Sequence, residues 1–326
     1  MSANEPVLAV RDLRVFFKLR SEGLFGAPKT LRAVDGVTFD LARKETLGVV
    51  GESGCGKSTL ARAVLGLVPI TSGEVLFAGK NLARLSAVEM REQRRHLQII
   101  FQDPLASLDP RMTVGQIIAE PLREHRPGMS KDEMNQRVRA MMGKVGLREQ
   151  MINRYAHEFS GGQCQRIGIA RALIVEPKLI VCDEPVSALD VSIQAQIVNL
   201  LKSLQQEMKL ALIFIAHDLA VVKHISDRVM VMYLGHVMEL ADKHSLYARP
   251  RHPYTRALLS AVPVPNPAIE RTKVVQILSS DIPSPINPPT GCVFHTRCPI
   301  AQARCAVDVP PLRTLEHGVA AACLLA

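Results

Sequence analysis

The sequence has 326 residues, which suggests two domains or one large domain with an extension. Hydrophobic residues make up 47% and charged residues 22%, so a large packed core is expected and global disorder is excluded. The formal net charge of +9 suits a negatively charged partner: a nucleotide, a nucleic acid or an anionic membrane surface. Aromatic residues are only 4%, with no Trp, which disfavours proteins that stack single-stranded bases.

The sequence contains no run of about 18 uninterrupted apolar residues, so we expect no membrane-spanning helix. The first residues lack a basic stretch followed by an apolar one, so we expect no signal peptide and a cytosolic protein. In that reducing compartment the seven Cys are expected to be free thiols or metal ligands rather than disulfides.

Short apolar runs that stop at polar residues predict strands covered on both faces. In chain order they are residues 47–50, 179–182, 210–215 and 229–232, the last followed by a hairpin mate at 236–240. Residues 20–30 are expected to be a loop insertion between early strands. Strands alternating with helices predict a mostly parallel α/β sheet, with ligands at the carboxyl ends of the strands.

Helices are predicted between these strands, at residues 60–67, 130–150 and 163–175. A further helix follows Asp190, because apolar residues recur there at helical spacing and form one stripe. Its members are Ile193, Ile197, Leu200, Leu201, Leu204 and Met208.

Composition changes near residue 245. Twelve of the 21 Pro and four of the seven Cys lie beyond that point. We therefore predict a regular body at residues 1–245, with a helical subdomain at about 103–175, and a small loop-rich extension at 246–326. Because the extension has no long amphipathic stripe, burial alone is not expected to fix its shape.

Residues 51–59, GESGCGKST, fit the phosphate-loop pattern G-x-x-x-x-G-K-S/T between an apolar strand and a helix. The glycines let backbone N–H groups surround phosphates, and the helix N-terminus adds partial positive charge. Lys57 is predicted to reach the β and γ phosphates, Ser58 to ligate Mg²⁺ and Thr59 to contact the α-phosphate. The remaining candidates in the loop are Gly51, Ser53, Gly54, Cys55 and Gly56. The alternative is a glycine-rich turn without a ligand.

Two acids end the run at residues 179–184. Asp183 at the end of a buried strand is predicted to hold Mg²⁺ through water, and Glu184 to polarise a water for attack on the γ-phosphate. The alternative is an acidic cap between strand and loop. His217 follows another apolar run and is a candidate contact for the γ-phosphate.

A further motif ends 20 residues before Asp183 and consists of Phe159, Ser160, Gly161, Gly162 and Gln163. With this motif and the preceding ones, residues 7–245 resemble the ATP-binding subunits of ABC transporters. The resemblance implies a P-loop NTPase fold: a RecA-like core, an antiparallel β part and a helical subdomain. It implies further roles: Gln102 as the Q-loop residue beside Mg²⁺, Ser160–Gln163 as the signature, Asp190 in the D-loop, His217 as the switch histidine, and Phe17 (or Phe16) stacked on adenine.

In this family the signature of one subunit completes the ATP site of the other, so hydrolysis needs a head-to-tail pair. Residues 101–111 and 251–258 resemble the peptide-importer branch, and the chain is similar to its second ATPase subunit, of the dipeptide type. The resemblance implies a second ATPase, forming a heterodimer, two permeases and a substrate-binding protein. It also implies a peripheral position on the cytoplasmic face of the inner membrane, and no nucleic acid. Alternatives are a nickel or other small-solute importer, and a soluble ABC ATPase acting on ribosomes or DNA.

Four cysteines in the extension, Cys292, Cys298, Cys305 and Cys323, form the other candidate site. Zinc sites usually use closer cysteine pairs, and wider loops suit an iron–sulfur cluster. Some peptide-importer ATPases, which this segment resembles, carry a 4Fe–4S cluster there. Zinc and four unrelated buried thiols are the alternatives, with His295 and His317 as spare ligands. Cys55, Cys164 and Cys182 are expected to be packing residues or neutral variants.

Overall fold

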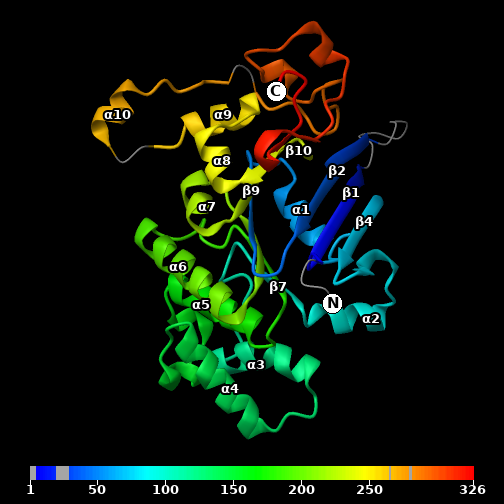
Figure 1. Cartoon of the computed structure of the whole chain (residues 1–326). Helices are drawn as coiled ribbons and strands as arrows, with labels where there is room; N and C mark the ends of the chain where they lie inside the picture. Colours follow the sequence, from blue (N-terminus) through cyan, green and yellow to red (C-terminus); the bar gives the residue numbers. More distant parts are fainter. Residues whose placement is uncertain (1–4, 20–28, 264–265, 279–280) are drawn as a thin grey trace. The chain divides into compact units, whose positions relative to one another are not determined.

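The computed structural model describes residues 5–19, 29–263, 266–278 and 281–326 (Figure 1). The chain divides into two compact units. The first contains Met1–Val7, Leu41–Thr46 and Arg84–Ala216, and the second contains Leu8–Asp40, Leu47–Ala83 and His217–Ala326. The predicted loop insertion at residues 20–30 lies almost wholly outside the described residues. The boundary at 245 and the helical subdomain at 103–175 stay predictions.

Parallel strands form the sheet of the first unit. They are β6 (Leu97–Ile100), β7 (Leu179–Asp183) and β8 (Ala211–Ile215), with β7 paired to the other two. Every residue of β7 and β8 is buried, which explains why both strands are continuous apolar runs. Asp183 is the last residue of β7 and pairs with Ile215, so its carboxylate stands at the carboxyl edge of this sheet.

Several helices of the first unit begin at side-chain caps. Thr113, Ser130 and Ser160 each accept a hydrogen bond from the backbone N–H three residues later, which satisfies a donor left free by the first turn. The predicted helix 130–150 ends earlier than expected, at Lys144, because Gly146 turns the chain with φ 74°. The helices are α2 (Ala87–Arg94), α3 (Val114–His125), α4 (Lys131–Lys144), α5 (Gly161–Leu173) and α6 (Val191–Met208).

The predicted apolar stripe of α6 is confirmed at its centre. Ile197, Leu201 and Leu204 are buried, whereas Ile193 and Met208 near its two ends are half-buried. Among the other helices, α3 packs against both α4 and α5 (Figure 1). Arg171 of α5 donates to the Ser107 carbonyl at 2.6 Å, which fixes the segment after Gln102 to the signature helix.

An antiparallel sheet is part of the second unit, in the strand order β2–β1–β4–β5. Its strands are β1 (Leu8–Leu19), β2 (Lys29–Leu41), β4 (Ser72–Phe77) and β5 (Lys80–Asn81). Leu8 pairs with Phe77, and both side chains are buried. The antiparallel part of the predicted fold is therefore present.

A second group of strands in this unit surrounds β9 (Arg228–Tyr233). Strand β3 (Thr46–Val50) is parallel to β9, and β10 (His236–Asp242) is antiparallel to it. The predicted hairpin through residues 234 and 235 is thereby confirmed. Two short strands of the extension, β12 (Ala320–Ala321) and β11 (Arg313–Thr314), continue this sheet beyond β10.

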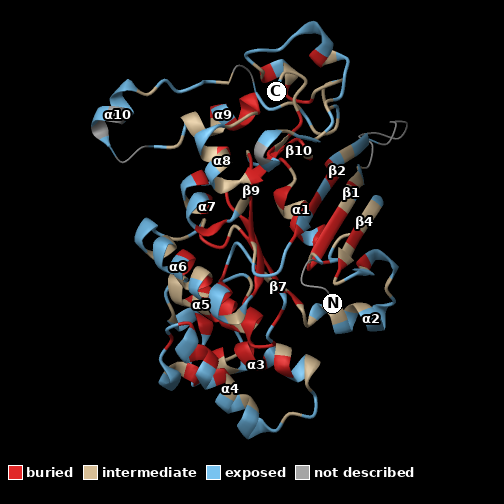
Figure 2. Ribbon diagram, in the orientation of Figure 1, coloured by how far each residue is buried: buried red, intermediate tan, exposed pale blue. Residues whose placement is uncertain are grey.

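The helices of the second unit are α1 (Lys57–Val64), α7 (Leu219–Ile225), α8 (Lys243–Ala248), α9 (Pro253–Ser260) and α10 (Pro267–Thr272). Helix α1 begins three residues before the predicted start at residue 60, directly after the glycine-rich loop. Buried residues follow the strands, and the outward faces of the helices are exposed (Figure 2). In the described part of the chain, no helix has both the length and the apolar character needed to cross a membrane.

The extension contains a buried aromatic centre. Phe294 is fully buried, with its ring centroid 5.3 Å from that of Tyr233 and 5.3 Å from that of Tyr254. His252 lies 5.6 Å from the same ring. One aromatic side chain placed among distant residues therefore gives the extension a buried centre, although the extension has no amphipathic stripe.

Candidate functional site

The phosphate-binding loop, defined here as residues 51–56, connects β3 to α1, as predicted. Gly56 has φ 106°, and a Cβ there would stand 2.1 Å from the Ala33 carbonyl oxygen, so only glycine fits. Lys57 is buried, and its Nζ donates to the carbonyls of Gly51 at 2.8 Å and Glu52 at 3.0 Å. The lysine cation thus lies inside the curve of its own loop, where phosphates are expected in this motif.

The other residues of the loop differ in exposure to solvent. The carbonyl of Cys55 accepts the Gly235 N–H at 2.9 Å, and burial raises the pKa of the Cys55 thiol. The side chain of Cys55 therefore serves in packing. Ser53 and Gly54 are exposed, while Ser58 and Thr59 at the start of α1 are half-buried. These positions fit a bound Mg–nucleotide, because Ser53 and Gly54 leave that part of the loop open and the Lys57 cation lies within its curve.

Glu52 connects the loop to the C-terminal half of the second unit. Its carboxylate accepts two hydrogen bonds from Arg297, at 2.6 and 3.1 Å, and its N–H donates to the Tyr254 hydroxyl at 3.0 Å. None of these contacts follows from a pattern in the sequence. Tyr254 lies in the run 251–258 that signals the peptide-importer branch, but nothing in the pattern pointed to Arg297.

The acidic site of the first unit is built around Glu184. Its carboxylate accepts a hydrogen bond from the Gln102 amide at 3.1 Å, so the structure brings these two predicted residues together. Glu184 adopts a left-handed conformation, φ 48°, held by its N–H to the Ile215 carbonyl at 3.1 Å and by Ser187 Oγ at 3.1 Å. An uncommon backbone conformation kept by specific bonds is typical of functional positions. Asp183 beside it is buried.

The predicted signature forms the start of α5. Ser160 is the N-cap, and Gln163 Oε1 accepts the Ser160 N–H at 3.0 Å in a capping box. Gly161 and Gly162 occupy the first turn, and a Cβ on Gly162 would meet Ile193 Cγ2 at 2.6 Å. The small residues let α5 and α6 approach and leave the N-terminal N–H groups accessible, as an anion site requires.

Three predicted residues have a defined place but no tested role. Asp190 is the exposed N-cap of α6, and His217 is exposed two residues after β8. Phe17 is half-buried in β1, while the neighbouring Phe16 ring has the Arg32 guanidinium 5.8 Å from its centroid. Stacking of adenine on Phe17 stays a prediction.

The predicted iron–sulfur site is not supported. Cys292, Cys298, Cys305 and Cys323 are near enough to influence one another: burial raises the pKa of the Cys292 thiol, and the other three cysteines add to that rise. Nevertheless, within the described residues no three His, Cys, Asp or Glu side chains are grouped to hold a metal ion. The side chain of His317, a spare candidate, lies outside the described residues.

The physical reason for this correction is that the extension is fixed by other means. Phe294 fills an aromatic centre, Arg297 pairs with Glu52, and β12 pairs with β10. The backbone N–H of Cys292 donates to the Cys305 carbonyl at 2.8 Å, which closes a loop without a metal. These contacts hold the segment in the structure without a metal ion, and an iron–sulfur cluster is not supported.

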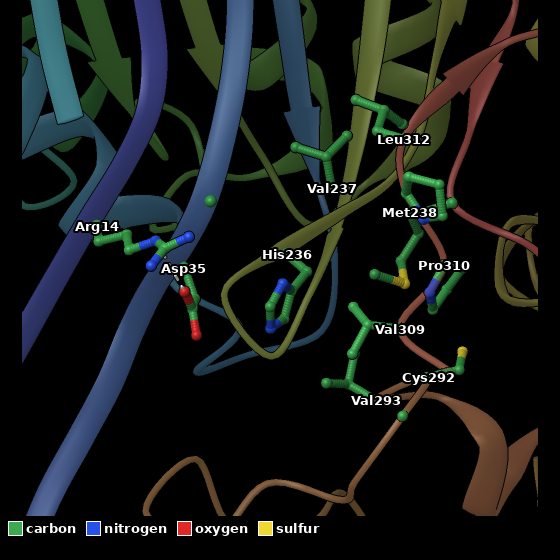
Figure 3. Close-up of a pocket in the computed structure, with 14 residues that line it drawn as sticks. Arg14, Asp35, His236, Val237, Met238, Cys292, Val293, Val309, Pro310 and Leu312 are labelled. Carbon is green, nitrogen blue, oxygen red and sulfur yellow. Dashed lines mark ion pairs between the residues drawn. The ribbon is translucent and has the colours of Figure 1, made fainter. Parts of the chain in front are cut away.

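A separate pocket of about 280 Å³ lies between β1, β2, the start of β10 and the extension (Figure 3). The Arg14–Asp35 ion pair and His236 border one part of it, and Val309, Pro310 and Cys292 border another. Its lining residues, all within the described chain, lie outside the phosphate-binding loop. The pocket is therefore not the predicted phosphate site.

Comparisons with known proteins agree with this geometry. The family described as ABC transporter matches residues 34–187, and the family described as oligopeptide/dipeptide transporter, C-terminal region, matches residues 238–305. The oligopeptide transport ATP-binding protein OppF of Salmonella typhimurium is 63% identical over 96% of this chain and 95% of its own length. A putative peptide import ATP-binding protein of Brucella ovis is 56% identical over 98% of both chains.

Solved structures give the same fold. A dimeric ATP-binding cassette in a post-hydrolysis state, bound to ADP and Pi, has a TM-score of 0.65 and 28% identity, covering 72% of this chain and 98% of that one. CbiO1 from Clostridium perfringens, part of an ABC transporter complex, has the same TM-score and identity, covering 76% and 92%. The predicted P-loop NTPase fold is confirmed.

The fold, the phosphate-binding loop and these matches define an ATP-binding cassette. The chain belongs to the ABC transporter ATPases, in the branch that carries the oligopeptide/dipeptide transporter C-terminal region. Such cassettes are enzymes that couple ATP hydrolysis to transport, and they work with membrane permeases.

Proposed function

We propose that this chain is the ATP-hydrolysing subunit of an importer for short peptides, with oligopeptides as its substrates. The observation that carries this proposal is the 63% identity, over nearly the whole of both chains, to an oligopeptide transport ATP-binding protein. The C-terminal region matched at residues 238–305 supports the same substrate class. These matches favour peptides over nickel, and the cassette with its transporter-type extension disfavours an enzyme acting on ribosomes or DNA.

In the second unit, Lys57 and the main chain of the phosphate-binding loop would bind the ATP phosphates, and Ser58 is the candidate ligand of Mg²⁺. In the first unit, Asp183 and Gln102 are the candidate ligands of Mg²⁺. When bound there, Mg²⁺ would neutralise the charge that develops on the phosphate. Glu184 accepts a proton from the water that attacks the γ-phosphorus, and the bond to the ADP oxygen breaks. Gln102 orients Glu184, since its amide donates to that carboxylate at 3.1 Å.

The same proposal extends to the remaining predicted residues. His217 contacts the γ-phosphate, Phe17 stacks on adenine, and Asp190 belongs to the segment that meets a second ATPase. The signature residues Ser160–Gln163 complete the ATP site of that second subunit, through the accessible N-terminus of α5. Support for pairing comes from the dimeric cassette to which this chain is similar.

We further propose that the second ATPase is a different chain, so that the pair is a heterodimer. The pair would bind two permeases at the cytoplasmic face of the inner membrane, and a substrate-binding protein would deliver the peptide. The chain would be peripheral there.

The test is transport by the assembled system. The chain is co-expressed with two permeases, its partner ATPase and the binding protein, reconstituted in vesicles, and supplied with ATP and labelled oligopeptides. We expect peptide uptake that stops with Lys57→Ala, whereas Lys202→Ala, a lysine on α6, leaves it unchanged. Uptake of nickel without peptide, or peptide uptake that survives Lys57→Ala, would overturn the proposal.

A further inference from the structure

Glu52 is held at three points within the second unit. Its N–H donates to the Tyr254 hydroxyl at 3.0 Å, its carbonyl accepts from Lys57 Nζ at 3.0 Å, and its carboxylate is paired with Arg297 at 2.6 and 3.1 Å. Two of these three partners belong to the C-terminal part of the chain. The third is the lysine expected to bind the phosphates.

Arg297 is itself precisely placed. It is 7% exposed and ends the short helix His295–Arg297, which directly follows the buried Phe294. Its guanidinium lies 5.7 Å from the centroid of the Tyr233 ring and donates to the Tyr233 hydroxyl at 3.5 Å. Tyr233 in turn packs against Tyr254, with ring centroids 4.9 Å apart. A bidentate guanidinium supported in this way holds a carboxylate in one orientation.

Because Glu52 is negatively charged, its ion pair with Arg297 should affect the binding of a nucleotide. An acidic side chain in a loop that must receive phosphates repels them unless a cation compensates it, and a partly buried position weakens the screening by water. The Glu52 side chain is only 25% exposed. Arg297, a residue of the extension, neutralises the Glu52 carboxylate. The cation of Lys57 then stays available for phosphate.

We propose that Arg297 is a positioning residue for ATP: by holding the Glu52 carboxylate it neutralises the acidic position of the phosphate-binding loop and fixes the main chain of that loop. The extension then has a role in nucleotide binding, and any partner that displaces the segment around Arg297 would weaken the affinity of the loop for ATP. This inference rests on the proposed ATP site at residues 51–59 and adds a determinant of its affinity.

The experiment measures the dissociation constants of fluorescent ATP and ADP for the full chain, for Arg297→Met, for Glu52→Gln and for the double variant. We expect Arg297→Met to weaken ATP binding about tenfold and ADP binding less, because repulsion grows with phosphate charge. The double variant should bind ATP within about threefold of the original chain, because it no longer contains an uncompensated carboxylate. Arg304→Met, an exposed arginine of the same extension, is the matched control and should change nothing.

The outcomes separate the two proposals. If neither the original chain nor Arg304→Met binds ATP, the proposed function fails. If these bind but folded Arg297→Met keeps its ATP affinity, or the double variant binds as weakly as the single one, the inference fails. Should Arg297→Met not fold, Arg297→Lys decides: it keeps the charge but loses the bidentate geometry, so a loss of ATP affinity of at least about threefold supports the positioning role, and unchanged affinity overturns it.

Discussion

The phosphate-binding loop and the extension around residues 292–298 belong to the same unit but obtain their shapes differently. The turn of the loop depends first on its neighbours in sequence: Gly56 permits the turn, and Lys57 bonds to the Gly51 and Glu52 carbonyls. Arg297 adds one contact from a distant part of the chain. The extension depends on residues far away in the chain, since Phe294 packs between Tyr233 and Tyr254.

Because of this difference, substitutions in the two regions should have different effects on activity and stability. Changes at Glu184 and Gln102 should remove chemistry while the fold persists, because neither side chain is buried. Changes in the extension remove burial and an ion pair, so they reduce stability first and reach the nucleotide through Arg297 and Glu52. The predictions below separate these two kinds of effect.

The largest expected effect is on hydrolysis. Glu184→Gln should lower the ATP turnover of the assembled transporter at least about 100-fold, because an amide cannot accept the water proton. The free energy of unfolding should change by less than about 0.5 kcal/mol. Turnover is measured by phosphate release, with Glu207→Gln, an exposed carboxylate on α6, as control. Turnover close to that of the original chain would show that Glu184 is not the base.

Removing the partner of Glu184 should have a smaller effect. Gln102→Ala deletes the 3.1 Å hydrogen bond to the carboxylate and should lower turnover about tenfold, the worth of one such bond in the transition state. ATP affinity should stay within about twofold, and transport should fall more than affinity. Both are measured on the reconstituted system. A large loss of ATP affinity with normal coupling would contradict this role.

In the extension the main effect should be on stability. Phe294→Ala removes a fully buried ring and should lower the free energy of unfolding by about 3 to 5 kcal/mol in urea. Val307→Ala, at a position 76% exposed in the same extension, should cost less than about 0.5 kcal/mol. A cost below about 1 kcal/mol at Phe294 would mean that the aromatic centre does not fix the extension.

His252 should make this region sensitive to acid. Burial lowers its pKa to about 4, and its Nδ1 accepts the Tyr254 N–H at 3.1 Å. Below pH 6.5, the pKa of His252 in the unfolded chain, His252 is protonated in the unfolded chain but stays neutral in the folded chain. The free energy of unfolding therefore falls as the pH decreases. Between pH 7 and 5 we expect a loss of about 2 kcal/mol.

His252→Asn is the matched variant for that pH series, because Asn can also cap the helix but does not titrate. The difference in unfolding free energy between the two proteins should shrink by about 2 kcal/mol as the pH falls to 5. Parallel pH profiles would show that His252 is protonated equally in both states.

Features fixed by residues close in sequence could be predicted, whereas features fixed by distant contacts could not. Strand β7, the loop at residues 51–56 and the capped start of α5 were predictable, because each depends on residues within one short segment. Gln102 was assigned to the site by a family resemblance rather than by spacing, and its hydrogen bond to Glu184 appears only in the structure. Arg297 was not predictable, since its partner Glu52 lies 245 positions earlier and neither residue forms part of a periodic pattern.

The cysteines show the opposite error. Their spacing suggested a metal because the extension has many prolines and no apolar stripe. A single phenylalanine surrounded by Tyr233, Tyr254 and His252 supplies the missing burial. Composition counts cannot show that contact, because its members come from β9, α9 and the loop before it.

The measurement that tests the central claim most directly is amide hydrogen exchange of full-length Glu184→Gln with and without Mg–ATP. If the extension and the phosphate-binding loop are anchored to each other through Glu52 and Arg297, ATP should slow exchange in residues 292–298 as well as in residues 51–57. Adding Arg297→Met should abolish the slowing at 292–298. Protection of residues 51–57 with unchanged exchange at 292–298 would contradict the account.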